Sequence, residues 1–161
     1  MGWLNDPTPP SKKNKNIIPK EFRKGIGNKI FGCDDCLAIC PWNKYAKLSN
    51  ETKFNHEMYN FDLHDLLKLC DETFRVKFRG SPIKRIGRDR FLRNCCISAG
   101  NSNNKNLLPD IIKLLMDDKS FIVRGAAVWA FQQLSDKELY KHIKVKHLNI
   151  EKDTSVIQEW T

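Results

Sequence analysis

The sequence predicts a mainly α-helical fold, and three patterns support this prediction. Apolar residues recur at spacings of three and four from Phe61 onward, which is the period of a helix with one buried face. Two stretches within this helical part match each other in the same order, which indicates an internal repeat. Residues 17–45 instead hold glycines and prolines among short apolar pairs, so loops and short turns are expected there.

The first element, residues 1–16, is predicted to be an unstructured lead-in. It contains three prolines and several lysines and shows no apolar periodicity. It also lacks the apolar run of a secretory signal, and no stretch of the chain approaches the roughly 20 apolar residues of a membrane helix. We therefore expect a cytoplasmic protein with no membrane partner.

The second element, residues 17–60, carries three of the chain's six cysteines in a C-x2-C-x3-C-P run formed by Cys33, Cys36 and Cys40. In a reducing compartment such cysteines are metal ligands, reactive thiols or small apolar residues rather than disulfides. Thiolates at this spacing can bind one iron-sulfur cluster or divide between two, and a last cysteine followed by proline commonly serves the neighbouring cluster. The segment is therefore predicted to be a partial, ferredoxin-like 4Fe-4S loop.

Two other kinds of site are weighed against this one. A structural zinc site needs four donors, and a second C-x2-C pair or a histidine pair at matched spacing is missing. A thioredoxin-type redox pair belongs at a strand-to-helix junction, and the chain shows no alternation of strands and helices.

The third element, residues 61–161, is predicted to be a HEAT-like α-helical repeat domain. Residues 63–71 match 108–116 and residues 92–99 match 123–130, so each unit is a helix pair that buries its apolar face by stacking on its neighbour. The first unit contains about 14 extra residues, among them 79–88, and an insertion that interrupts a repeat is a good place for function.

The repeat also predicts the role of the other three cysteines. Cys95 and Cys96 align with Ala126 and Ala127, and Cys70 aligns with a leucine of the second unit. All three are expected to be small buried residues of the helix packing.

Composition adds a candidate partner. The chain has 161 residues, enough for one domain or for a small module docked on a larger one, and its formal charge is +9. A field of this sign favours anions, so nucleic acid is a possible partner, and a basic protein without a nucleic-acid role is the alternative.

Together these motifs resemble one known family. Residues 18–44 resemble the second cluster motif of epoxyqueuosine reductases, and residues 80–88, 93–94, 100–102 and 123–130 resemble the C-terminal helical repeats of that family. The resemblance implies reduction of an epoxide on the wobble base of tRNA to an alkene, the last step of queuosine synthesis, by a cobalamin enzyme with two [4Fe-4S] clusters.

The resemblance also implies roles for residues. Cys33 and Cys36 would bind the cluster nearer the cobalamin, Cys40 would bind the other cluster, and the backbone at Cys33 and Asp34 would lie close to the corrin. Trp42 would stack on a base or cover the cluster, and covering is the expected role. The helical repeats would grip the tRNA anticodon stem-loop, and a set of cations that flanks the site is expected to bind its phosphates. The alternative for each of these cations is a solvated surface charge without a role in binding. These cations are Lys20, Arg23, Lys24, Lys84, Arg85 and Arg88.

The chain departs from the family in length and in ligands. Family members are about twice as long, and their cobalamin domain, their first cluster motif and a further ligand cysteine precede the part that matches. A [4Fe-4S] cluster takes four cysteines, whereas the motif offers three. We therefore expect the C-terminal part of a reductase that works with a separately encoded N-terminal half. The alternatives are a basic HEAT-repeat module that binds RNA or protein without redox chemistry, and a non-functional gene remnant.

Overall fold

A computed structural model describes residues 16–47 and 61–161, and within these residues the regular structure is entirely helical. The predicted mainly α-helical fold is confirmed for this part of the chain. The lead-in, apart from Asn16, lies outside the described residues, as does the stretch 48–60. The elements, in chain order, are α1 (Lys20–Ile26), α2 (Asp35–Ala38), η2 (Pro41–Tyr45), α3 (Leu63–Leu67), α4 (Asp71–Lys77), η5 (Pro82–Ile86), α5 (Arg88–Asn101), η6 (Lys105–Leu107), α6 (Leu108–Asp117), α7 (Phe121–Leu134), α8 (Lys137–Leu148) and α9 (Thr154–Glu159).

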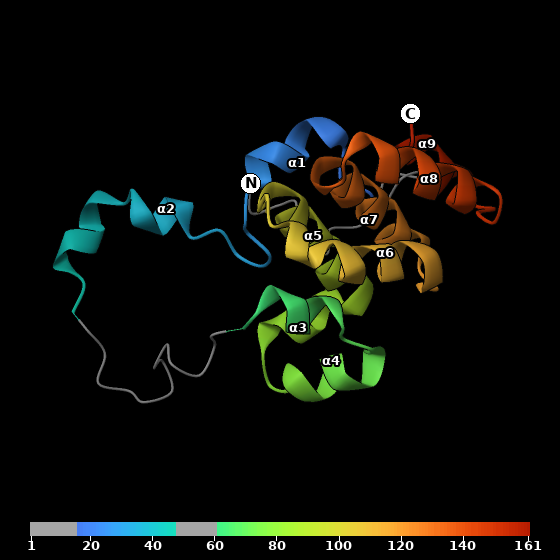
Figure 1. Cartoon of the computed structure of the whole chain (residues 1–161). Helices are drawn as coiled ribbons and strands as arrows, with labels where there is room; N and C mark the ends of the chain where they lie inside the picture. Colours follow the sequence, from blue (N-terminus) through green and yellow to red (C-terminus); the bar gives the residue numbers. More distant parts are fainter. Residues whose placement is uncertain (1–15, 48–60) are drawn as a thin grey trace.

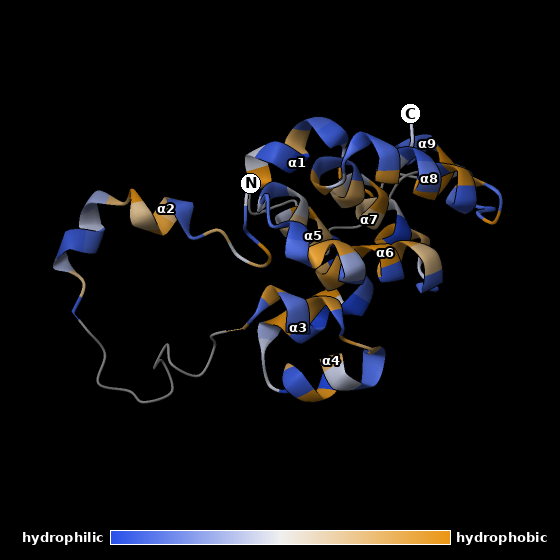
Figure 2. Ribbon diagram, in the orientation of Figure 1, coloured by the Kyte–Doolittle hydropathy of each residue, from blue (hydrophilic) through white to orange (hydrophobic). Residues whose placement is uncertain are grey.

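Helix α7 is the centre of the core. It packs against α5, α6 and α9, and its residues from Ile122 to Phe131 are nearly all buried. Such a helix, apolar on most of its circumference, is stable only when neighbours cover it on several sides. Figure 2 shows many apolar residues on α5, α6 and α7, which lie together in the helical body. None of the described helices is long and apolar enough to cross a bilayer.

The two aligned pairs of small residues lie in this core. Cys95 and Cys96 on α5 are fully buried, and Ala126 and Ala127 on α7 are at most 5% exposed. Their predicted packing role is confirmed. Burial raises the pKa of both thiols well above the ordinary value, because a thiolate there would lack water.

The prediction for Cys70 is wrong. The apolar pattern from Leu63 to Phe78 forms two helices, α3 and α4, and Cys70 is the exposed N-cap residue just before α4. Its sulfur accepts from the backbone N–H of Thr73 at 3.5 Å, and the Thr73 hydroxyl accepts from the N–H of Cys70 at 3.0 Å. This reciprocal pair is a capping box in which Cys70 and Thr73 stand where Ser or Thr and Glu or Gln are usual.

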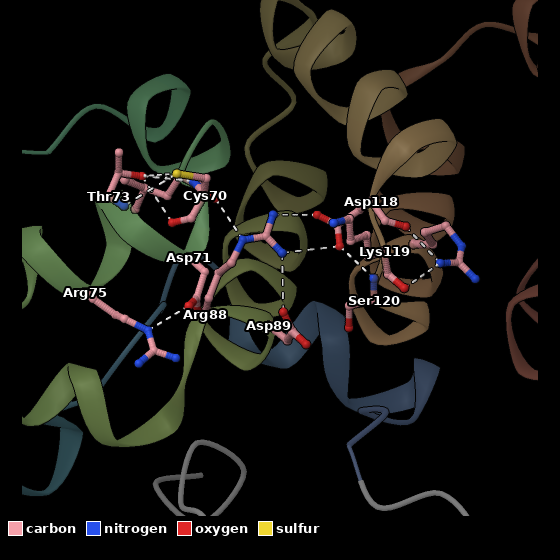
Figure 3. A network of polar contacts seen from close by, with 11 residues as sticks. Cys70, Asp71, Thr73, Arg75, Arg88, Asp89, Asp118, Lys119 and Ser120 are labelled. Atoms are coloured by element: carbon pink, nitrogen blue, oxygen red, sulfur yellow. Dashed lines mark hydrogen bonds and ion pairs between the residues drawn. The ribbon is translucent and has the colours of Figure 1, made fainter.

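The first residue of α5, Arg88, links two turns that are distant in sequence (Figure 3). Arg88 donates to the carbonyl of Leu69, between α3 and α4, at 2.9 Å. It also donates to both carboxylate oxygens of Asp118, between α6 and α7, at 2.6 and 3.3 Å. Asp118 in turn accepts from the backbone N–H of Ser120 at 2.9 Å. This one side chain therefore holds the α3–α4 turn and the α6–α7 turn in fixed positions relative to α5.

The N-terminal helix is tied to the C-terminal one. Arg23 on α1 is 2% exposed and donates to both carboxylate oxygens of Glu159 on α9, at 2.8 and 2.6 Å. Its Nε also donates to the carbonyl of Ile18 at 2.8 Å, and its guanidinium lies 5.7 Å from the ring centroid of Trp129. Asn101, the last residue of α5, donates to the carbonyls of Arg23 and Gly27 at 2.9 and 2.8 Å. The segment that leads to the cysteines is therefore anchored on the helical body.

Candidate iron-sulfur segment and cationic surface

The three motif cysteines lie on an arm that extends away from the helical body (Figure 1). Cys33 precedes α2, Cys36 lies within it, and Cys40 caps η2. Gly32 and Asp34 both have positive φ angles, 65° and 49°, which makes the chain turn tightly around Cys33. Glycine adopts this conformation freely, and aspartate is among the few other residues that do so with little strain.

The thiols of this arm are accessible. Cys36 is exposed, Cys33 and Cys40 are intermediate, and all three are free. In residues 16–47 and 61–161 no group of three or more His, Cys, Asp or Glu side chains is arranged to hold a metal ion. The chemistry of the donors suits iron, since three thiolates occur within eight residues, but their number falls short of the four that one cluster takes. The residues present therefore fit part of a cluster site.

One ion pair joins residues on either side of Cys33. Lys29 Nζ lies 2.5 Å from Asp35 Oδ2, at the first turn of α2. The hydrogen bond to Asp35 raises the pKa of Lys29, and the nearby Cys33 acts in the same direction. The charged ammonium of Lys29 is thus held by Asp35 on the chain that flanks Cys33.

The arm also carries uncovered apolar side chains. Trp42 is 75% exposed and Tyr45 is 66% exposed. The side chains of Leu37 and Ile39 are also exposed to solvent. The ring of Trp42 faces solvent in this chain, and its expected role of covering the cluster stays a prediction. Tyr45 was not singled out from the sequence, although its position three residues after Trp42, within a turn that begins with Pro41, is a usable signal.

The cations of the inserted segment divide into two kinds. Lys84 and Arg85 are exposed and line a surface hollow of about 540 Å³ together with Gly80, Ser81 and Pro82. Arg88 points inward to Leu69 and Asp118, and its side chain is 18% exposed. The expected phosphate contact by Arg88 is therefore corrected, since this guanidinium links the helices.

The cations before the cysteines divide in the same way. Lys20 and Lys24 are exposed, and Lys20 Nζ donates to the carbonyl of Glu159 at 3.1 Å. Arg23 is buried in its ion pair with Glu159, so we correct the expectation that it contacts phosphates. The exposed cations Lys20, Lys24, Lys84 and Arg85 remain as the candidate cationic surface.

Known proteins share these features. Residues 7–43 match the model of a 4Fe-4S double cluster binding domain. An epoxyqueuosine reductase of Pseudomonas aeruginosa is 36% identical over 121 residues, which are 74% of this chain and 34% of that protein. A crystal structure of epoxyqueuosine reductase with an epoxyqueuosine-modified tRNA-Tyr stem loop superimposes with a TM-score of 0.83 at 29% identity, over 91% of this chain and 40% of that one. The chain belongs to the epoxyqueuosine reductase family.

The match to the epoxyqueuosine reductases is partial in length. The chain spans about a third of the curated reductases that it matches, and it corresponds to their C-terminal part. It spans more of another relative, an uncharacterized protein in the gldA 3′ region of Geobacillus stearothermophilus, which is 32% identical over 149 residues, 91% of this chain and 68% of that protein.

Proposed function

We propose that this chain forms the C-terminal part of an epoxyqueuosine reductase and acts in reducing epoxyqueuosine to queuosine at the wobble position of tRNA. The observation that carries this proposal is the accessible C-x2-C-x3-C arm on a body that matches epoxyqueuosine reductases in sequence and in structure. An arm whose thiols and apolar residues face outward is suited to completing a site together with another polypeptide segment.

In this proposal Cys33 and Cys36 hold one [4Fe-4S] cluster, and Cys40 crosses to a second. The remaining thiolates come from a separately encoded N-terminal half, which also binds most of the cobalamin, with the backbone at Cys33 and Asp34 facing it. When bound, these groups would supply the electrons that reduce the epoxide to an alkene. The chain's own part is to hold its three thiolates on a tight turn and to keep Lys29 beside Cys33.

The partner on the substrate side is proposed to be the tRNA anticodon stem-loop. A related epoxyqueuosine reductase was crystallised with such a stem loop. In this chain Lys20, Lys24, Lys84 and Arg85 are exposed cations that could neutralise phosphates. The proposal includes two HEAT-like units, α3–α5 and α6–α7, and a location in the cytoplasm.

The cluster proposal is tested by counting iron. The full chain, co-expressed anaerobically with the reading frame immediately upstream of its gene, should bind iron, sulfide and cobalamin and reduce the epoxide. Replacing Cys33, Cys36 and Cys40 with serine should abolish the iron bound by this chain, because hard hydroxyls do not replace thiolates on iron. Cys70→Ser is the matched control, an exposed thiol outside the motif, and it should retain the iron.

Two results would contradict the proposal. Activity of the chain without the upstream product would refute the shared ligand set, and unchanged iron in the serine variants would refute the assigned ligands. A chain that stays colourless after iron-sulfur reconstitution together with the upstream product, but still binds tRNA, would support the second candidate, a basic helical module without redox activity. That candidate is favoured by the formal charge of +9 and by the exposed cations Lys20, Lys24, Lys84 and Arg85.

The RNA proposal is tested by salt dependence. Replacing Lys84 and Arg85 with alanine should weaken binding of an anticodon stem-loop and make the plot of log affinity against log salt shallower, by about 0.7 to 0.9 for each phosphate that is no longer neutralised. Lys141→Ala with Lys146→Ala removes the same charge from exposed positions of α8 and should leave the slope nearly unchanged. Equal effects in both variants would place the RNA surface elsewhere.

A further inference from the structure

We propose that Trp42 and Tyr45 form a stacking platform for an unpaired nucleobase of the bound RNA. The inference rests on the RNA-binding part of the proposed function and adds a site that reads an unstacked base rather than phosphates. Neither ring belongs to the core cluster, and both are more exposed than buried.

The local backbone places both rings on one side of η2. Pro41 fixes the first position of this 3-10 helix, and residues three apart in such a helix eclipse each other. The ring centroids of Trp42 and Tyr45 accordingly lie 5.9 Å apart, with the planes inclined by 41°. Since the planes are inclined, the rings do not cover one another's faces as a parallel stack would.

Exposure of these rings has an energetic consequence. An aromatic side chain buries roughly 150–250 Å² when it is covered, so an open tryptophan offers a large gain to any ligand with a flat apolar face. Every nucleobase has such a face, and unpaired bases in RNA loops are commonly recognised by stacking on aromatic rings.

The charges around the rings favour RNA over a polypeptide. Lys44 Nζ lies 5.0 Å from the ring centroid of Tyr45, Lys47 is exposed, and residues 41–47 contain no acidic side chain. An aromatic surface with cations beside it matches a base flanked by phosphates. The aliphatic side chains of the arm, Leu37 and Ile39, lie before this turn, so the aromatic part is chemically distinct.

The position along the chain gives the platform a function. Cys40 caps η2, and its carbonyl accepts from the backbone N–H of Asn43 at 3.0 Å. A base held by Trp42 therefore lies on the same short turn as a proposed cluster ligand. Stacking one loop base here would orient the anticodon loop relative to the reducing site.

The test measures binding of the full chain to two RNAs, a tRNA anticodon stem-loop and a blunt RNA duplex without unpaired bases. Trp42→Ala should lower stem-loop affinity about 5- to 160-fold, the usual loss for one base stacked on an aromatic ring, and should leave duplex affinity unchanged. The salt slope should stay the same, because stacking releases no counterions. Trp42→Phe should restore most of the affinity, and Ile39→Ala, at a side chain 83% exposed on the same arm, should have no effect.

Several outcomes would overturn the platform. If Trp42→Ala binds the stem-loop as well as the unsubstituted chain does, while the Lys84 and Arg85 variant flattens the slope, the platform is wrong and the RNA proposal stands. Equal losses on stem-loop and duplex would indicate an interaction without base stacking. Loss of co-purification with the upstream product, at unchanged RNA affinity, would show that a polypeptide covers these rings. Absence of RNA binding by the unsubstituted chain would remove both proposals.

Discussion

His147 on α8 lies inside the protein with both ring nitrogens hydrogen-bonded. The indole N–H of Trp160, which can only donate, lies 3.0 Å from Nδ1, so Nδ1 is the acceptor. Nε2 then carries the proton and donates to the carbonyl of Leu115 on α6 at 3.0 Å. The neutral ring thereby joins α8 to α6 and to the end of α9, and burial lowers its pKa although the nearby Glu151 opposes this.

This arrangement predicts a pH-dependent stability. Because the pKa of His147 is lower in the folded chain than its ordinary 6.5, the unfolded chain binds the proton first, and stability is lost as the pH falls from about 6.5 toward the folded pKa. Urea unfolding at several pH values should show this loss. His147→Gln should remove the step, whereas His142→Gln, at an exposed position of the same helix, should keep it.

The contribution of Glu151 falls in a different pH range. Burial works against its charge, but hydrogen bonds from Arg124 and from the backbone N–H groups of Asp153 and Lys152 lower its pKa to about 2. Its stabilisation is therefore lost only as the pH falls from 4.5 toward 2. A step in stability confined to that lower range would contradict the assignment to His147.

Between elements, the contact of α5 with α7 depends on a glycine. A Cβ at Gly100 would lie 2.6 Å from Cζ3 of Trp129 and 3.0 Å from the Cα of Ala130. The absence of a side chain on α5 therefore lets the two helices approach closely at this point, where the indole occupies the space.

Substitution at this crossing should be costly. Gly100→Ala should lower the free energy of unfolding by about 1–3 kcal/mol, because neither the α7 backbone nor the packed indole can move freely. Gly125→Ala is the matched control in α7, since the nearest atom to its Cβ, Cγ of Glu159, would be 3.6 Å away. That change should be neutral or stabilising by up to about 1 kcal/mol, as alanine favours a helix. Similar losses in thermal or urea unfolding for both variants would contradict the crowding at Gly100.

Across the whole molecule, an ion pair joins α1 to α9. Its two residues, Arg23 and Glu159, lie 136 positions apart in the sequence. The two side chains are 2% and 7% exposed, so each charge depends on the other. Gln132 on α7 and Lys20 on α1 also donate to the carbonyl of Glu159, at 2.9 and 3.1 Å. The C-terminal helix thus supports the segment that leads to the cysteine arm.

Breaking this pair should weaken the attachment of α1. Glu159→Gln should lower the free energy of unfolding by about 3–5 kcal/mol, because the guanidinium of Arg23 stays buried without a counter-charge. Amide hydrogen exchange should rise in Lys20–Ile26. Asp71→Asn, which removes a partner of the exposed Arg75, is the control and should cost no more than about 1 kcal/mol. Unchanged exchange in α1 would mean that other interactions hold it.

The sequence by itself determined the helical class, the buried pairs at Cys95–Cys96 and Ala126–Ala127, the cysteine motif and the family. These features depend on apolar spacings of three and four residues, on an internal repeat or on motifs read directly from the chain, so the order of residues alone is sufficient. The tertiary structure decided which cations face solvent, because the partners of Arg23 and Arg88, Glu159 and Asp118, are distant in sequence. It also decided the exposure of Trp42, since covering a side chain depends on what the rest of the fold brings to it.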